Sequence, residues 1–519
     1  MRTSITTLLT SLATILAASS VVAADLDGTV KLGGIIRNQT GDRTAVQEMF
    51  NVYDGFSLSQ IALQGMLAPR QYVALDLREI NLDSRRGNLV YRLPGMVKVT
   101  ADYRQHRQIF SPDGNVHSMR KDWRTGAEVT PVRWLELTGH LDSQTRDGDR
   151  LSFPLGVLSA LGTSYDNRLL TGDVGAQVRG NGRGAAVTYS ASSFTDELDP
   201  GAHRTGQLVS ARLWAPCRFV PRLSHFVRAA WGVRRLSDRD LDYRLGLFEY
   251  TGVLRPVDAL QLRYDFDARR IDDQATRLKT DRFENAIDAT WFHRYGQLSG
   301  GYAHETNDDD QTLTHFNTWH GGAVLRWGRR LDANLDVASR VRKDEAEVTL
   351  LRDVDATQIR ARLQFRPNDA LAVGAGFSRR ERDFTDIGVD LQGDEVHVFG
   401  SYAYPAWGAL SGDYAYTNDD DRDLLSGSFH LQSHVVTGRV ELDRIPDLKL
   451  AGGVTWLRMR RDLDIEKSLV FVEGVLTPIR DYHLEVKYNA YNYDDYILLD
   501  RFYTANVLRI DLAYDLHVR

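Results

Sequence analysis

Two short acidic phrases contain the residues of this chain that are best suited to chemistry. The phrase "TNDDD" occurs twice and places Asn307–Asp310 in its first copy and Asn418–Asp421 in its second. Carboxylate and amide oxygens are the ligands that Ca²⁺ prefers, but both copies lack the glycine and the distal glutamate of an EF-hand loop. Solvated loop tips between two strands are the alternative interpretation. We therefore predict no resident metal and no cofactor.

The sequence contains none of the motifs that carry enzymatic or haem chemistry. Its 14 histidines are scattered without an HExxH pair, and no GxSxG elbow is present. No CxxCH motif occurs, so the chain attaches no c-type haem. Cys217 is the single cysteine, so no intrachain disulfide can form. These observations predict a protein that is not an enzyme and that has no catalytic, cofactor-binding or metal-binding residues.

The first residues predict export. Arg2 precedes an apolar run at 8–18, and small residues suited to cleavage follow at 21–24, as in a secretory signal peptide. We expect residues 1–24 to be the signal peptide and residues 25–519 to form one domain. The apolar run is short for a membrane anchor, and no later stretch approaches the roughly 18 consecutive apolar residues of a spanning helix.

Alternating apolar and polar residues run along the rest of the chain. The segment 255–270 is typical. One face carries Leu260, Leu262, Tyr264 and Phe266, and the other face carries Gln261, Arg263, Asp265 and Asp267. The same plan recurs at 130–142, 366–377, 445–456 and 477–488, each time after a proline-marked turn. Longer acidic connections alternate with these short turns, an asymmetry that is typical of outer-membrane barrels.

The spacing of these segments predicts the fold class. Counting from Thr29 to the end gives about 26 strands, and an even number returns both ends of a barrel to the periplasm. We expect an all-β fold, a large single-chain antiparallel transmembrane β-barrel without a plug domain, in the outer membrane of a Gram-negative bacterium. The sequence agrees less well with a soluble β-propeller or a β-helix, because those folds require a motif that repeats at a fixed period and none is found. Charges of both signs are interspersed, so no nucleic-acid partner is expected.

In such a barrel the apolar face contacts lipid and the charged face lines a lumen. This interpretation places Leu262 and Leu512 in lipid, and it places Gln261 and Ala513 in the lumen, where arginine should be tolerated. The charged lumenal residues near these positions are our candidates for contact with a lumenal partner. They are Arg263, Asp265, Arg509, Asp511, Asp515 and His517.

Three phrases carry a resemblance to a known family. They are "YAHETNDDD" at 302–310, "YAYTNDDD" at 414–421 and "YNYDDYILLDRFYTANVLRIDLAYDL" at 491–516. With the repeated hairpins, they resemble the decahaem-associated outer-membrane β-barrel family (MtrB/PioB-like). The resemblance implies a barrel that sheathes a periplasmic multihaem c-type cytochrome in its lumen, permits electron transfer across the outer membrane and contacts outer-membrane lipid. An extracellular cytochrome at the outer loops is a further implied partner.

Other functions remain open. A wide diffusion porin for large or charged solutes predicts a long inward-folding constriction loop, and the sequence shows none. The longest irregular stretches, near 38–52 and 145–165, are each too short to plug a barrel of this width. A polysaccharide or lipopolysaccharide export barrel usually carries a periplasmic domain, and the lipopolysaccharide class also carries disulfides. A structural or adhesive barrel would have long outer loops.

Overall fold

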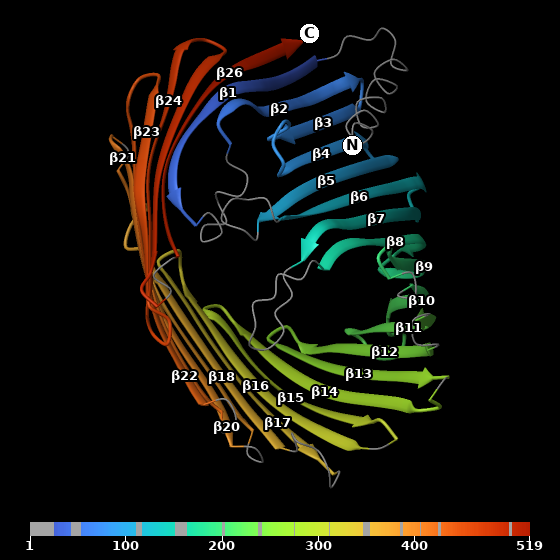
Figure 1. The fold of residues 1–519 in the computed structure, drawn as a ribbon. Helices are drawn as coiled ribbons and strands as arrows, with labels where there is room; N and C mark the ends of the chain where they lie inside the picture. Colours follow the sequence, from blue (N-terminus) through green and yellow to red (C-terminus); the bar gives the residue numbers. More distant parts are fainter. Residues whose placement is uncertain are drawn as a thin grey trace.

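The chain forms one closed antiparallel sheet of 26 strands in a computed structural model (Figure 1). The structure describes residues 25–42, 53–109, 117–150, 163–199, 203–236, 241–274, 276–310, 312–345, 353–384, 388–404, 406–423, 427–497 and 501–518. Each strand pairs with its neighbours in sequence, and β1 pairs with β26 over most of its length, which closes the sheet. The all-β barrel of 26 antiparallel strands is therefore confirmed, whereas the absence of a plug domain stays a prediction.

The strands are β1 (Asp25–Gly41), β2 (Gly55–Ala68), β3 (Gln71–Arg78), β4 (Arg85–Leu93), β5 (Val97–Ile109), β6 (His117–Val132), β7 (Leu135–Arg150), β8 (Thr163–Gly180), β9 (Arg183–Asp196), β10 (Arg204–Pro216), β11 (Leu223–Leu236), β12 (Leu241–Val257), β13 (Leu260–Asp273), β14 (Lys279–His293), β15 (Gly296–Asp308), β16 (Leu313–Trp327), β17 (Leu331–Asp344), β18 (Asp353–Phe365), β19 (Leu371–Phe384), β20 (Val389–Tyr404), β21 (Gly408–Asp423), β22 (Gly427–Ile445), β23 (Leu448–Arg461), β24 (Ile465–Ile479), β25 (Tyr482–Asp495) and β26 (Phe502–Val518). Among the described residues, no helix is both long enough and apolar enough to cross a membrane.

The two ends of the barrel differ in their connections. At one end the turns are short, such as 69–70, 133–134 and 258–259, and at the other end they are mostly longer. The start of β1 and the end of β26 lie together at the short-turn end (Figure 1). Short turns and both chain ends face the periplasm in bacterial barrels, so the longer connections face outward.

Prolines at the short turns interrupt strand pairing. The register shifts of β6–β7, β12–β13 and β24–β25 fall at Pro131, Pro256 and Pro478. A proline has no N–H to donate to the ladder, so it is tolerated only where pairing stops or bulges. The repeated proline phrase of the sequence therefore marks the points at which the chain leaves one strand and turns into the next.

The two faces of the sheet separate apolar from polar residues. On the outer face Ile287 is 61% exposed, Trp231 59% and Leu512 52%, as expected for side chains that contact lipid. On the inner face of β26, Ala513 is only 1% exposed and lies between Lys31 of β1 and His483 of β25. Ala513 is therefore buried in the wall and not free in the lumen, so an arginine there would have to displace its neighbours, contrary to the expectation of easy tolerance.

The connection between β3 and β4 folds into the barrel. Its residue Leu82 packs against Ile35 of β1, Tyr491 of β25 and Val507 of β26, all on the inner face, and is 7% exposed. The Asn81 side chain accepts a hydrogen bond from the Leu58 amide at 2.8 Å and donates one to the Phe56 carbonyl oxygen at 2.7 Å. The segment 79–84 thus fills part of the lumen beside the closing seam, although the sequence indicated no inward-folding connection.

The two TNDDD phrases occupy different structures. In the first copy β15 ends at Asp308, and Asp309 and Asp310 form the connection. The second copy lies wholly inside β21 and pairs with β22, so it is no loop tip. Within the described ranges, no group of three or more His, Cys, Asp or Glu side chains is arranged to hold a metal ion. Of the two stretches expected to be irregular, 38–41, 145–150 and 163–165 are strand, and 43–52 and 151–162 lie outside the described residues.

Candidate functional site

A pocket of about 800 Å³ opens on the inner face of β7 to β13. One continuous row of cross-strand partners crosses it. From β7 to β13 the row reads His140, Asp173, Ser190, Leu208, Gly232, Leu245 and Ile271. Because direct partners share a face of the sheet, the whole row faces the lumen. We call this site the lumenal pocket.

The lumenal pocket lies in the outer half of the barrel. A second row crosses it nearer the outer end and contains Asp142, Thr171, Ser192, Gly206, Arg234 and Tyr243. Leu236 is the last residue of β11 and Tyr243 lies near the outer start of β12. A solute that enters from outside the cell therefore reaches this pocket before the periplasmic half of the lumen.

Small residues make the hollow. Gly206 lies beside Ser192 in the outer row, and in the other row Leu208 separates Gly232 from Ser190, so Leu208 is the one large side chain among these small residues. A Cβ at Gly232 would lie 2.5 Å from the Gln207 carbonyl oxygen, so the sheet itself requires glycine there. Strands usually avoid glycine except where a bulge forms or another group approaches closely.

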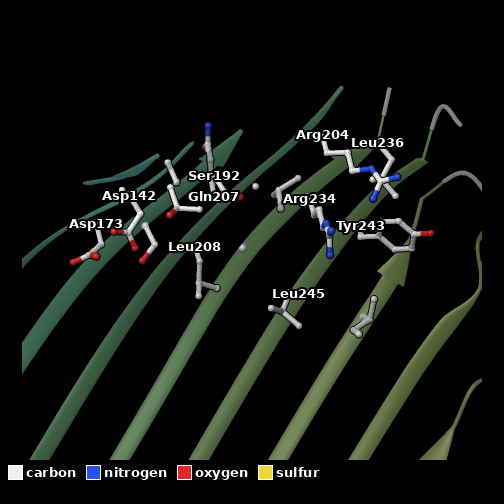
Figure 2. A pocket seen from close by; sticks show the side chains of 18 of the residues that line it. Asp142, Asp173, Ser192, Arg204, Gln207, Leu208, Arg234, Leu236, Tyr243 and Leu245 are labelled. Carbon is white, nitrogen blue, oxygen red and sulfur yellow. The ribbon is translucent and has the colours of Figure 1, made fainter. Parts of the chain in front are cut away.

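The walls of the lumenal pocket carry opposite charges. Figure 2 shows Asp142 and Asp173 at one end, and Arg204, Arg234 and Tyr243 at the other. The Nδ1 atom of His140 lies 3.1 Å from a carboxylate oxygen of Asp173. The Asp173 carboxylate at the acidic end therefore already has a partner within the barrel.

Two arginines form the basic end of the lumenal pocket. The Arg204 guanidinium lies 5.6 Å from the centre of the Phe194 ring, and Arg234 forms no ion pair with any residue that the structure describes. Between these ends, the leucine and isoleucine side chains of the pocket supply an apolar floor. Ligand pockets of about 300–1,000 Å³ with an apolar lining and a few convergent polar groups are the usual form of binding sites.

Elsewhere the lumen carries charges that are paired within the barrel. Arg228 lies 3.2 Å from Glu249, and Arg269 lies 2.8 Å from Asp267. Glu305 receives both Arg282 at 3.0 Å and Arg340 at 3.2 Å. Exposed pairs of this kind each contribute about 0–1 kcal/mol to stability, but together they leave a wall that is polar and nearly neutral. Arg234 differs from these paired arginines in having no ion pair with a described residue, and Arg212 on the same inner face shares that property.

The candidates from the sequence all lie on the inner face, in two separate places. Arg263 and Asp265 of β13 pair with each other at 2.6 Å. On the opposite part of the sheet, Arg509 pairs with Asp511 at 2.8 Å, and Asp511 also accepts a hydrogen bond from the Ser59 hydroxyl.

The other two candidates on β26 are also paired. Asp515 accepts hydrogen bonds from Thr29 at 2.7 Å and from His483 at 2.8 Å, and His517 lies 2.7 Å from Asp27. All six candidates therefore contact other barrel residues, and none lines the lumenal pocket. Their contact with a partner stays a prediction.

Sequence reasoning did not find the lumenal pocket. In "YRLGLFEY" (243–250) both faces of β12 are apolar, because Leu245 and Leu247 face the lumen while Phe248 faces lipid. Alternation, the signal that identified the lumen elsewhere, is therefore lost here. The glycines within the strands, Gly206 and Gly232, were the available signal.

Comparison with solved structures shows a similar fold in outer-membrane transport proteins. The FrpB iron transporter from Neisseria meningitidis (F3-3 variant) has a TM-score of 0.54 and 8% identity, covering 97% of this chain and 83% of that chain. Its F5-1 variant has a TM-score of 0.52 and 8% identity, covering 95% and 83%. A mutant of the ferric enterobactin receptor PfeA from Pseudomonas aeruginosa has a TM-score of 0.50 and 8% identity, covering 95% and 81%.

No protein-family model matches the chain, and no curated protein matches it. At 8% identity the structural likeness concerns the fold alone. It corrects the expected resemblance to the MtrB/PioB-like family, since the similar solved structures are an iron transporter and a ferric enterobactin receptor. The misleading features were hairpins, acidic connections and alternation, which lipid and water impose on any large outer-membrane barrel.

The functional expectations based on that resemblance are corrected with it. The solved structures of similar fold are an iron transporter and a ferric enterobactin receptor, so the expected cytochrome sheath, electron transfer across the membrane, diffusion porin and polysaccharide export barrel are each wrong. A multihaem cytochrome in the lumen and an extracellular cytochrome at the outer loops are likewise wrong as partners. The closed barrel and its structural neighbours place the protein in the outer membrane of a Gram-negative bacterium.

Proposed function

We propose that the protein is an outer-membrane import barrel that captures a bulky polar ligand from outside the cell at the lumenal pocket. The observation that carries this proposal is an uncompensated arginine, Arg234, beside an apolar floor in the outer half of the lumen. What sets this position apart from other lumenal arginines is the apolar floor beside it, which can bind the organic part of a ligand while the arginine binds an anionic group.

An iron chelate is the proposed ligand class. The pocket has an apolar floor and an aromatic ring at Tyr243 for the organic part of a chelate, and Arg204 and Arg234 for its anionic groups. Arginine binds carboxylate and other planar oxyanions through two parallel hydrogen bonds. The likeness in fold to the FrpB iron transporter and the ferric enterobactin receptor supports this class of cargo. The barrel itself would catalyse no reaction.

We further propose that residues 1–24 are a removed signal peptide and that residues 25–519 form the barrel without a separate plug domain. The strands and their connections occupy 25–518, which supports this division. The inward segment 79–84 would narrow the lumen in place of a larger insert. Its packing against β1, β25 and β26 supports that role.

Ligand binding to the purified barrel tests the proposal. Ferric enterobactin and ferric citrate serve as probes, and isothermal titration in detergent measures the dissociation constant. Wild type should bind at least one probe, and Arg234→Gln should weaken that binding by about 10–100-fold, since a hydrogen bond to a charged group contributes about 1.5–3 kcal/mol. Arg263→Gln is the matched control, because Arg263 also faces the lumen but is paired with Asp265. Equal loss in both variants would show that Arg234 has no special part in binding.

A further inference from the structure

A second hollow lies on the opposite, lipid-facing side of the sheet at its periplasmic end. It has a volume of about 480 Å³ and is formed by β8, β9, β10 and β11. One row of cross-strand partners crosses it, namely Val178, Ala185, Leu213 and Val227. We call this hollow the lipid-facing groove.

Alternating residue size shapes the groove. Ala185 lies between Val178 and Leu213 in the row, and Ala215 lies one step nearer the periplasm on β10. The flanking side chains project outward, with Val178 42% exposed and Leu213 56% exposed. The alanines form the floor and the larger side chains form the walls, so the groove presents a concave apolar surface to the membrane.

The periplasmic end of the groove is basic. Arg183, the first residue of β9, pairs with Gly180 across the turn and lines the groove. Arg183 forms no ion pair with any described residue, and His225 of β11 lines the same end.

The neighbouring turn supports a position at the membrane boundary. In the connection 217–222, Arg218 follows β10 and Phe219 is 89% exposed. Exposed aromatic residues beside arginines are typical of the level of the lipid headgroups. The apolar hollow therefore continues into a positively charged end at the depth at which phosphates lie.

We propose that the lipid-facing groove binds one phospholipid of the periplasmic leaflet, with an acyl chain over Ala185 and Ala215 and an anionic headgroup at Arg183. The apolar floor fits a hydrocarbon chain, and the unpaired guanidinium favours a net negative headgroup over a zwitterionic one. This site is separate from the lumen, so the inference does not depend on the proposed import function. The attraction of one basic residue near a membrane surface corresponds to about a fivefold preference for an anionic lipid over a zwitterionic one.

Native mass spectrometry of the detergent-purified barrel tests this inference. The probes are phosphatidylglycerol, which is anionic, and phosphatidylethanolamine, which is zwitterionic, mixed in equal amounts. Wild type should retain one phosphatidylglycerol about five times more often than phosphatidylethanolamine. Arg183→Gln should bring the ratio close to one, and Ala185→Leu should reduce retention of both lipids, because leucine fills the floor.

Two control variants separate the groove from general effects. Ala289→Leu enlarges a residue on the outer face of β14, remote from the groove, and Arg329→Gln removes an arginine from another short turn. Both should leave the ratio and the occupancy unchanged, and resistance to unfolding in cold SDS shows that every variant is folded. Equal retention of the two lipids by wild type, or unchanged occupancy in Ala185→Leu, would overturn the proposal.

Discussion

Gly206 of β10 and Arg234 of β11 are direct cross-strand partners on the inner face of the barrel. Because Gly206 has no side chain, β10 contributes no cover over this part of the lumenal pocket, and Arg234 lines an open hollow. The next strand contributes only Ser192 at this level. The binding capacity that we propose therefore depends on a missing side chain as much as on a charged one.

Filling this hollow should abolish capture of the ligand. In Gly206→Val, the new Cβ would lie 2.7 Å from the Ser192 hydroxyl, which can rotate away, and a β-branched residue suits a strand. We expect the barrel to assemble normally and to bind the iron chelate at least about tenfold more weakly, which corresponds to about 1.4 kcal/mol. Gly246→Val on the lipid face of β12, where nothing lies within 4 Å of a new Cβ, is the control. Normal binding by Gly206→Val would show that the ligand sits elsewhere.

The inward segment should stabilise the closing seam. Leu82→Ala removes a buried side chain from the cluster with Ile35, Tyr491 and Val507, and such truncations cost about 2–5 kcal/mol. Urea unfolding of the barrel in detergent should show that loss, while Leu325→Ala on the lipid face should change stability much less. If both variants unfold at the same urea concentration as wild type, the segment does not stabilise the seam.

The orientation of the strand faces can be tested with added charge. Leu262→Arg and Leu512→Arg should reduce assembly in the outer membrane, because an arginine facing mid-bilayer lipid costs about 2–4 kcal/mol. Gln261→Arg points into the lumen and should assemble. Heat-modified migration on gels reports the folded fraction. Efficient assembly of Leu262→Arg would mean that the faces of β13 are reversed.

Cys217 provides a pH-dependent test of the periplasmic turn. A hydrogen bond from the His225 side chain, followed by bonds to the backbone at Val220 and Phe219, lowers the pKa of the Cys217 thiol to about 7. Since the thiolate is the reactive form, alkylation by iodoacetamide should rise as the pH increases through about 7, below the range of about 8.5 for an ordinary cysteine. His225→Phe should move the midpoint upward, toward that of an ordinary cysteine. An unchanged midpoint would contradict the assigned hydrogen bond.

The sequence predicted the barrel well because lipid imposes a period of two on every spanning strand. The alternation at 260–267 and 508–517 correctly assigned β13 and β26, and the proline turns correctly divided the hairpins. Sequence reasoning failed where a structural feature depends on several strands that are brought together only by the fold. The packing of Leu82 inside the lumen requires β1, β25 and β26 to be adjacent, and the lumenal pocket requires glycines from two strands to meet. Alternation also cannot identify the occupant of a lumen, since any polar content requires the same pattern.

Uptake of radioactive iron by intact cells tests the central claim most directly. A strain that lacks this gene is complemented with wild type, Arg234→Gln or Arg263→Gln, grown under iron limitation and supplied with iron-labelled ferric enterobactin or ferric citrate. The account predicts saturable uptake of at least one chelate with wild type and with Arg263→Gln, and a loss of about tenfold or more at subsaturating concentration with Arg234→Gln. Uptake that is independent of the gene, or equal in all three complemented strains, would contradict it.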